Sequence, residues 1–275
     1  MQIKRLTGLF GAEIFDADIR DPTQFDALRA AFAEHSVITI RNQSITPDEH
    51  LAFARRFGPI NVNRFFKALN SHPEVALVLK EADQTGAIGE EWHTDHAYDL
   101  EPATGSILHA IDIPPYGGDT VFCSTTAAYD ALSDRFKHML EGLYAWHSSR
   151  HVFGAEAAAA DSSRSGRLGN AEKATQDVLH PVVICHPLSG RKSLFVNPQF
   201  TTHIDGLTSI ESDAILGAIY AHCQKPEFQA RVRWQKGDVT MWDNRATWHK
   251  AINDYHGHRR EMHRVTIEGC ALSPA

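Results

Sequence analysis

The feature of this 275-residue sequence that most limits its fold is a succession of short runs rich in β-branched and aromatic residues. The runs span residues 37–40, 75–79, 106–113, 120–123, 182–185, 193–196, 232–234, 239–242 and 262–267. Gly, Pro, Asn or Asp bounds many of them, as in the strands of an antiparallel sandwich or barrel. We therefore predict a mainly β fold.

Three segments carry helix signals between these runs. Asp21-Pro22 begins a helix to about residue 35, because Phe25, Leu28 and Phe32 then lie on one apolar face. Capping boxes at 46–49 and 208–211 begin two more helices, which end near Gly58 and near residue 223. We expect these helices to flank the sheets.

The composition is that of an ordinary globular protein, with 43% hydrophobic and 22% charged residues. At roughly 150 residues per domain, this length allows one large domain or two small ones. The sequence shows no internal repeat and no compositional break. We therefore predict a single domain over residues 1–275.

The charge balance disfavours nucleic acid as a general partner, since 27 Lys and Arg face 34 Asp and Glu, a net charge of −7. A basic segment at 256–264 keeps that alternative open. No apolar run of about 18 residues exists, and the N-terminus lacks the apolar core of a signal peptide. With four scattered cysteines, the chain is expected in the cytoplasm, away from membranes.

Residues 154–176 differ from the rest of the chain. A run of four alanines is followed by small and polar residues with little to bury. A structureless segment longer than about 15 residues in a compact domain is usually either functional or disordered. We expect a lid-like insertion here, with a disordered excursion as the alternative.

A candidate metal site begins in the segment 91–96, Glu-Trp-His-Thr-Asp-His. His93 and Asp95 are two residues apart, so on an extended strand their side chains project to the same side. With a distant histidine they would form a 2-His-1-carboxylate triad, which leaves coordination positions of Fe(II) open. The alternative is an ordinary hydrogen-bonded pair on a strand.

The second half of that site is expected near residues 242–249, where a predicted strand ends in polar turn residues and a histidine follows. His249 is the candidate third ligand. A surface histidine after a turn is the alternative, and other histidines compete for the role: His96, His109, His203 and His263.

The last predicted strand carries two arginines. Period-2 alternation places Arg260 and Arg264 on one face, about 13 Å apart. If that face points inward, each arginine needs an anionic partner, because a buried unpaired charge costs several kcal/mol or more. The alternative is a solvated basic edge strand that discourages aggregation.

Taken together, these motifs resemble the Fe(II)- and 2-oxoglutarate-dependent dioxygenases of the taurine dioxygenase (TauD/TfdA) family. The resemblance covers nearly the whole chain. It rests on four ordered segments, namely 92–95, 114–120 followed by 127–132, 242–247 with His249, and 259–264.

The resemblance implies a double-stranded β-helix, or jelly-roll, core of the cupin type. It implies His93, Asp95 and His249 as ligands of Fe(II), with O2 and 2-oxoglutarate as cosubstrates. Thr120 and Arg260 match the positions that hold the distal carboxylate of 2-oxoglutarate, and Arg264 matches the position that binds the substrate's anionic group. Two bidentate guanidinium groups suit two anions.

The implied substrate is a small anionic organic molecule, which is oxidised at a C–H bond with release of succinate and CO2. Taurine-specific members usually carry histidine and asparagine where this chain has Asn63 and Gly89. Phe153 and Phe200 fall where aromatic pocket walls are expected. With Asn63 and Arg264 they suggest a pocket for a sulfonate, an alkyl sulfate or an aryloxy carboxylate.

Two other functions compete with this one. A catalytically silent, cupin-like protein that binds small anions would lack a triad ligand or an arginine, and the sequence has them all. A nucleic-acid-binding role would rest on the basic segment alone. The N-terminal helices offer a surface for a homo-oligomer, although the sequence does not determine the oligomeric state.

Overall fold

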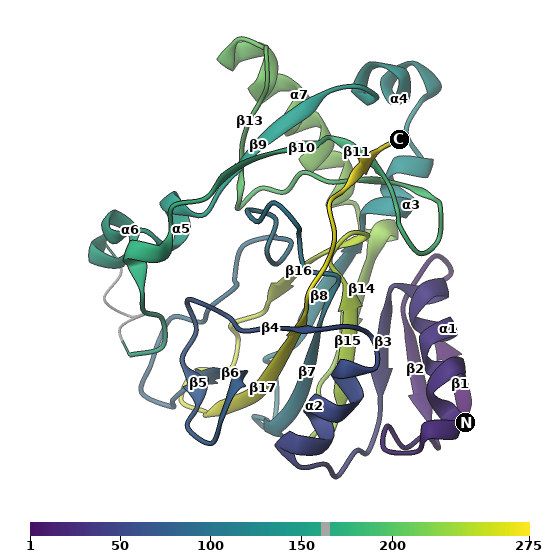
Figure 1. Cartoon of the computed structure of the whole chain (residues 1–275), viewed down its shortest axis with the longest axis vertical. Coiled ribbons are helices and arrows are strands. Elements are labelled where there is room, and N and C mark those ends of the chain that lie inside the picture. Colours follow the sequence, from purple (N-terminus) through teal and green to yellow (C-terminus); the bar gives the residue numbers. More distant parts are fainter. Residues whose placement is uncertain (161–165) are drawn as a thin grey trace.

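The computed structural model describes residues 1–160 and 166–275, and its core consists of two facing β-sheets (Figure 1). The larger sheet has the order β1-β2-β3-β15-β7-β17-β6-β5, with β4 paired to β17. Its strands are β1 (Gln2–Arg5), β2 (Ala12–Phe15), β3 (Val37–Ile40), β4 (Ile60–Asn61), β5 (Ala68–Leu69), β6 (His72–Lys80), β7 (Gly105–Asp112), β15 (Val239–Asp243) and β17 (Arg260–Ile267).

The second sheet of the core has the order β14-β8-β16, with all pairs antiparallel. It comprises β8 (Thr120–Ser124), β14 (Gln229–Val232) and β16 (Thr247–Ala251). Phe122 and Val232 from this sheet pack against Leu108, Trp242 and Met262 from the larger one. Leu108 and Trp242 of this apolar layer also line the pocket of the candidate site.

Two small three-stranded sheets complete the β structure of the described residues, β10-β9-β13 and β12-β11-β18. Their strands are β9 (Tyr144–Ser148), β10 (Asp177–Pro181), β11 (Val183–Cys185), β12 (Lys192–Leu194), β13 (Thr201–Ile204) and β18 (Ser273–Pro274). The mainly β fold with a jelly-roll arrangement of facing sheets confirms the fold expected from the sequence.

The helices lie at the sides of the sheets (Figure 1). They are α1 (Phe25–His35), α2 (Pro47–Arg55), α3 (Thr125–Asp130), α4 (Asp134–Leu140), α5 (Arg150–Phe153), α6 (Ala155–Ala160) and α7 (Ser209–Cys223), with 3-10 turns at Pro22–Gln24, Ala171–Lys173 and Pro226–Phe228. Helices α1 and α2 cover the outer face of the large sheet, where Phe32 and Phe53 pack with Ile107 and Val265. The capping boxes predicted for α2 and α7 are both present.

One predicted strand is misplaced. The run 232–234 was expected to form a strand, but β14 occupies residues 229–232, and Val232 is its last residue. The register with β8 explains the difference, since Val232 is already opposite Thr120, the first residue of β8. Trp234 lies beyond the ladder, and its indole N–H donates a hydrogen bond to the Thr120 hydroxyl at 3.0 Å.

A buried ion pair stabilises the turn between β15 and β16. Arg245 donates to both carboxylate oxygens of Asp243, with Nε–Oδ1 at 2.9 Å and Nη2–Oδ2 at 2.7 Å. His186 Nε2 donates to the same carboxylate at 3.0 Å. Burial by itself would raise the pKa of Asp243, but Arg245 and His186 outweigh it and hold this pKa below its ordinary value. The carboxylate is therefore ionised across the neutral range.

Replacing Asp243 with alanine is expected to lower the free energy of unfolding by about 3 to 5 kcal/mol, because Arg245 would stay buried without its partner. Since the folded pKa of Asp243 is depressed, its contribution is present above the unfolded pKa and is lost as the pH falls through the folded value. Urea denaturation measures both effects. Asp130→Ala, which removes an exposed partner of Arg191, is the control and should cost at most about 1 kcal/mol.

Candidate active site

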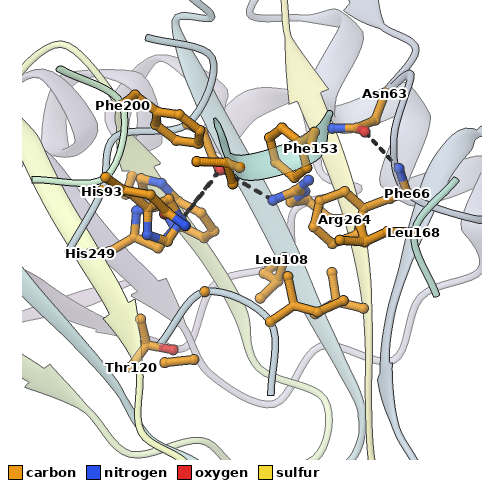
Figure 2. A pocket seen from close by; sticks show the side chains of 18 of the residues that line it. Asn63, Phe66, His93, Leu108, Thr120, Phe153, Leu168, Phe200, His249 and Arg264 are labelled. Carbon is orange, nitrogen blue, oxygen red and sulfur yellow. Dashed lines mark hydrogen bonds and ion pairs between the residues drawn. The ribbon is translucent and has the colours of Figure 1, made fainter. Parts of the chain in front are cut away.

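Two histidines and one aspartate meet at one end of the space between the core sheets. The candidate ligand atoms of His93, Asp95 and His249 lie within 4.8 Å of one another, and all three residues are buried. Nε2 of His93 is 3.7 Å from Asp95 Oδ1, and Nε2 of His249 is 3.9 Å from Asp95 Oδ2. Figure 2 shows both imidazoles on one side of the pocket, facing Arg264.

The backbone brings His93 and His249 together differently from the prediction. Residues 91–96 do not form a regular strand. A single antiparallel bridge joins His93 to His249 of β16, with N–O distances of 3.1 and 2.8 Å. After Asp95 the chain turns through His96, whose φ of 59° lies in the left-handed region. Strain of this kind is typical of functional sites.

Neighbouring groups orient the three candidate ligands. His93 Nδ1–H donates to the Glu91 carbonyl at 2.7 Å, which leaves the Nε2 lone pair directed into the site. The Ser106 hydroxyl donates to Asp95 Oδ2 at 2.8 Å. The sequence prediction missed Ser106, although alternation along 105–112 would have placed it on the inward face of β7 with Leu108. Hydrogen-bond partners of this kind fix the orientation of the ligands in metal sites.

The electrostatics favour neutral imidazoles and an ionised carboxylate. Burial lowers the pKa of His93 and of His249. Burial by itself would raise the pKa of Asp95, but the charge of Arg264 is the largest of the effects that outweigh it and hold this pKa below its ordinary value. Neutral histidine nitrogens and a carboxylate oxygen are the forms that bind metal ions.

The competing histidines lie elsewhere. His96 Nδ1 donates to Asp99 at 2.8 Å, and His203 is exposed on β13. His109 and His263 are paired across β7 and β17 at positions that alternate with the inward-facing ones. Within residues 1–160 and 166–275, His93, Asp95 and His249 are the only three ligand-type residues clustered tightly enough to hold a metal ion.

Arg260 and Arg264 both line the pocket and are buried, with exposures of 5% and 6%. The alternative of a solvated edge strand is therefore wrong, because β17 lies between β6 and β7 in the large sheet. Sequence alternation showed that the two arginines share a face, but the position of β17 in the sheet decides that this face is the inner one.

Arg260 lies at one end of the pocket with Thr120. Its Nε donates to the Gly118 carbonyl at 3.1 Å, and no carboxylate of the described residues lies within ion-pairing distance. Burial lowers the pKa of Arg260. Gly118 has a φ of +68°, and a Cβ there would lie 3.2 Å from Arg260 Cδ. Glycine thus allows the close approach that holds this guanidinium.

Arg264 lies closer to the triad, and its contacts were not predicted. Its Nη1 is 3.3 and 3.4 Å from the two carboxylate oxygens of Asp95. The guanidinium carbon lies 4.2 Å from the ring centroid of Phe66. Figure 2 shows Arg264 between the candidate metal ligands and Phe66.

The predicted aromatic wall is present, and it is larger than expected. Phe153 and Phe200 line the pocket with ring centroids 5.9 Å apart. Tyr98 and Phe66, which the sequence did not single out, line it as well. Tyr98 packs edge-on against Phe200 at 4.9 Å. Apart from Asp95, Arg260 and Arg264, the lining of the pocket is therefore largely apolar.

Asn63 lines the pocket, but part of its amide is already engaged. Its Oδ1 accepts hydrogen bonds from the backbone N–H groups of Phe65 and Phe66, both at 2.9 Å. Its Nδ2 lies 3.4 Å from His96 Nε2. In Figure 2 the bond from Asn63 to Phe66 lies at the rim beside Arg264. Asn63 thus shapes the turn that presents the Phe66 ring.

Gly89 has a steric role beside the triad. It adopts a φ of +85°, and a Cβ there would lie 3.2 Å from His93 Cε1. Its carbonyl accepts a hydrogen bond from the Ala251 N–H at 2.7 Å. A side chain at position 89 would strain the backbone and crowd a candidate metal ligand.

The jelly-roll fold, with two histidines and a carboxylate at an open pocket, is typical of non-haem oxygenases. The family model of the taurine catabolism dioxygenase TauD, TfdA family matches residues 2–266. The chain belongs to this family, as the sequence motifs predicted, and it is a 2-oxoglutarate-dependent dioxygenase.

Similar proteins cover almost the whole chain. An alkylsulfatase of Acinetobacter baylyi is 33% identical over 282 residues, covering 98% of this chain and 85% of the relative. An alpha-ketoglutarate-dependent 2,4-dichlorophenoxyacetate dioxygenase of Cupriavidus pinatubonensis is 36% identical over 280 residues, with 94% of each covered.

Solved structures show the same fold. A putative alpha-ketoglutarate-dependent taurine dioxygenase from Burkholderia xenovorans superposes with a TM-score of 0.83 at 32% identity, covering 98% of this chain and 93% of that one. AAD-2 in complex with Mn(II) and N-oxalylglycine superposes with a TM-score of 0.78 at 28% identity, covering 99% of this chain and 98% of that one.

Among the helices that the structure describes, none has the length and apolar character needed to cross a membrane.

Proposed function

We propose that this enzyme uses Fe(II), 2-oxoglutarate and O2 to oxidise a C–H bond of a small organic anion with an apolar body. The products are the oxidised substrate, succinate and CO2. The observation that carries the proposal is one pocket that joins a 2-His-1-carboxylate cluster to two buried arginines on one strand face. Arg260 is assigned the distal carboxylate of 2-oxoglutarate, and Arg264 is assigned the anionic group of the substrate.

His93, Asp95 and His249 would hold the iron. Their donor set fits the metal, because both imidazoles are neutral, the carboxylate is ionised, and the His93 Nε2 lone pair faces the cluster. The structural neighbour AAD-2, whose crystals contain Mn(II), supports a divalent metal in this fold. When bound, the metal supplies the oxygen activation that side chains cannot provide.

Arg260 and Thr120 would bind the distal carboxylate of 2-oxoglutarate. The guanidinium is buried without a carboxylate partner among the described residues, and an anion offsets that cost. The Thr120 oxygen accepts from Trp234, so its own proton is available for donation. These residues orient the cosubstrate and keep water from its charged end.

Arg264 would bind the substrate anion, with Asn63, Phe153 and Phe200 shaping the rest of the pocket. The relatives support three anion types, since their names include an alkylsulfatase, a 2,4-dichlorophenoxyacetate dioxygenase and a sulfonate dioxygenase. Taurine fits less well, because in the described lining Asp95, a metal ligand, is the only acidic group for its ammonium. We favour alkyl sulfates and aryloxy carboxylates over taurine.

A substrate panel tests the proposal. Enzyme reconstituted with Fe(II) would be supplied with 2-oxoglutarate, O2 and one of hexyl sulfate, phenoxyacetate, hexanesulfonate or taurine. Succinate and the oxidised product are quantified together. Stoichiometric turnover is expected with a substrate whose anion carries an apolar body, and taurine is expected to be poor. Equal or better turnover of taurine would contradict the substrate class.

Replacing Arg264 with alanine is expected to raise the Michaelis constant of the organic substrate by roughly 30-fold or more, because a buried charge pair is worth about 2 kcal/mol or more. The slow decarboxylation of 2-oxoglutarate without substrate should persist at saturating metal. Initial rates of succinate formation, measured with and without the organic substrate, distinguish the loss of substrate binding from a loss of decarboxylation. Loss of both reactions at saturating metal would contradict the assignment.

The whole chain is proposed to form one domain, with residues 154–176 as its lid. Residues 161–165 of that segment lie outside the described residues. On either side of them, Val152, Phe153 and Leu168 line the pocket. Leu168 pairs with Phe66 in a single antiparallel bridge. Contrary to the expectation of little to bury, Arg167 and Ala174 are buried.

Hydrogen exchange tests the lid. Amides of residues 166–176 are expected to exchange at least severalfold more slowly when 2-oxoglutarate and a turned-over substrate are bound with Mn(II) in place of iron, because a closed lid excludes water. Peptides from α1, remote from the pocket, serve as the internal control. Identical exchange of 166–176 in both states would refute the proposal.

A further inference from the structure

Arg264 belongs both to the candidate metal site and to the pocket beside it. Its Nη1 lies within 3.4 Å of both carboxylate oxygens of Asp95, a candidate metal ligand. Its side chain also lines the pocket in which the organic anion would bind. Figure 2 shows Arg264 between the two candidate histidine ligands and Phe66.

Apart from Asp95, the contacts of Arg264 bring it no negative charge. In the described part of the chain, Asp95 is the only carboxylate within ion-pairing distance, and Arg264 Nε is buried without a hydrogen-bond partner. The Phe66 ring lies against the guanidinium at 4.2 Å, which attracts the cation but carries no net charge. Asp95 in turn keeps a second partner, the Ser106 hydroxyl at 2.8 Å.

We propose that Arg264 is the counter-ion of Asp95 before the metal binds, so that metal and substrate anion bind with positive cooperativity through this guanidinium. The inference rests on the proposed function, which assigns a divalent metal to the triad and the substrate anion to Arg264. It adds a thermodynamic coupling that the proposed reaction does not require.

The coupling follows from charge balance. A divalent metal at Asp95 competes with Arg264 for the carboxylate and leaves the guanidinium beside a second cation. The substrate anion then becomes the partner that Arg264 lacks. Conversely, an anion already bound to Arg264 neutralises the guanidinium. Arg264 then competes less strongly with the metal for the Asp95 carboxylate, so metal binding costs less free energy. By linkage, each ligand must raise the affinity for the other by the same factor, commonly 5- to 150-fold.

Metal titration of variants tests the proposal without turnover. The Mn(II) affinity of the folded protein is measured at pH 7.5 from the electron paramagnetic resonance signal of free Mn(II), without 2-oxoglutarate. R264M should bind Mn(II) about tenfold more tightly than the wild type, because the competing cation is gone. R260M removes the other buried arginine of the same strand face, which does not contact Asp95, and should change the affinity at most about twofold.

A second variant separates charge from shape. R264K keeps the cation beside Asp95, so its Mn(II) affinity should stay near that of the wild type. An affinity of R264M equal to or weaker than that of the wild type would overturn the proposal, because Arg264 would then support the metal site rather than compete with it. Equal tightening in R264K and R264M would also overturn it, since the charge would not be the cause.

A further set of titrations measures the Mn(II) affinity in the presence of hexyl sulfate as the anion. For the wild type, saturating hexyl sulfate should raise the Mn(II) affinity at least about fivefold, and for R264M it should have no effect. A response that persists in R264M would overturn the proposed route. Failure of the wild type to bind Mn(II) at all would instead overturn the metal site of the proposed function, and the inference with it.

Discussion

Replacing His249 with alanine is expected to remove bound metal and turnover together while the protein stays folded. The substitution leaves two of three protein ligands, and the loss of even a side chain that only hydrogen-bonds to a metal ligand commonly costs about 10- to 100-fold in metal affinity. We therefore expect the Fe(II) affinity to fall by at least about 100-fold. Metal content after reconstitution and succinate formation measure the two losses.

The fold should survive because the backbone bridge between residues 93 and 249 does not depend on the imidazole. The two hydrogen bonds of that bridge are made by main-chain atoms, at 3.1 and 2.8 Å. The ring does pack against Trp242 at 4.7 Å, so a reduced free energy of unfolding is expected. Thermal unfolding followed by circular dichroism measures this loss separately from activity.

His109→Ala is the matched control, because it also deletes a buried imidazole from a core strand, in this case β7, on the face of the large sheet that packs against α2. It should keep its metal and most of its activity despite some loss of stability. If His249→Ala retained full iron content and turnover, the third ligand would be wrongly assigned. His93→Ala and Asp95→Ala would then show whether the cluster binds metal at all.

Replacing Arg260 with alanine is expected to raise the apparent Michaelis constant for 2-oxoglutarate by roughly 30-fold or more. Losing one member of a buried charge pair costs about 2 to 5 kcal/mol, and the lower limit corresponds to this factor. Steady-state rates at varied 2-oxoglutarate measure it. Arg260→Lys should recover only part of the affinity, because an ammonium cannot form the planar fork.

Arg259→Ala provides the control for Arg260, one residue earlier and on the opposite side. Arg259 is 38% exposed and pairs with three carboxylates, those of Glu81, Asp112 and Glu261. Its loss should leave the Michaelis constant for 2-oxoglutarate within about twofold, since exposed pairs contribute at most about 1 kcal/mol. Equal effects at both positions would contradict a specific role for Arg260.

Much of the local structure could be predicted because its causes are local. The capping box at Thr46 and Glu49 lies within one helical turn, and it begins α2 as expected. The run 37–40 forms β3 with the predicted bounds. Residues 229–232 could not be placed in this way, because β14 is defined by pairing with β8, which lies more than 100 residues earlier in the chain.

The sequence by itself determined which chemical groups the candidate site offers, namely two histidines, one carboxylate and two arginines in recognisable motifs. Only the tertiary structure decided their relations. The bridge between residues 93 and 249 selects His249 over the competing histidines, and the place of β17 between β6 and β7 turns its arginines inward. The contact of Arg264 with Asp95 joins residues 169 apart in the chain. Sequence periodicity reports which side chains share a face, whereas long-range strand pairing decides what that face meets.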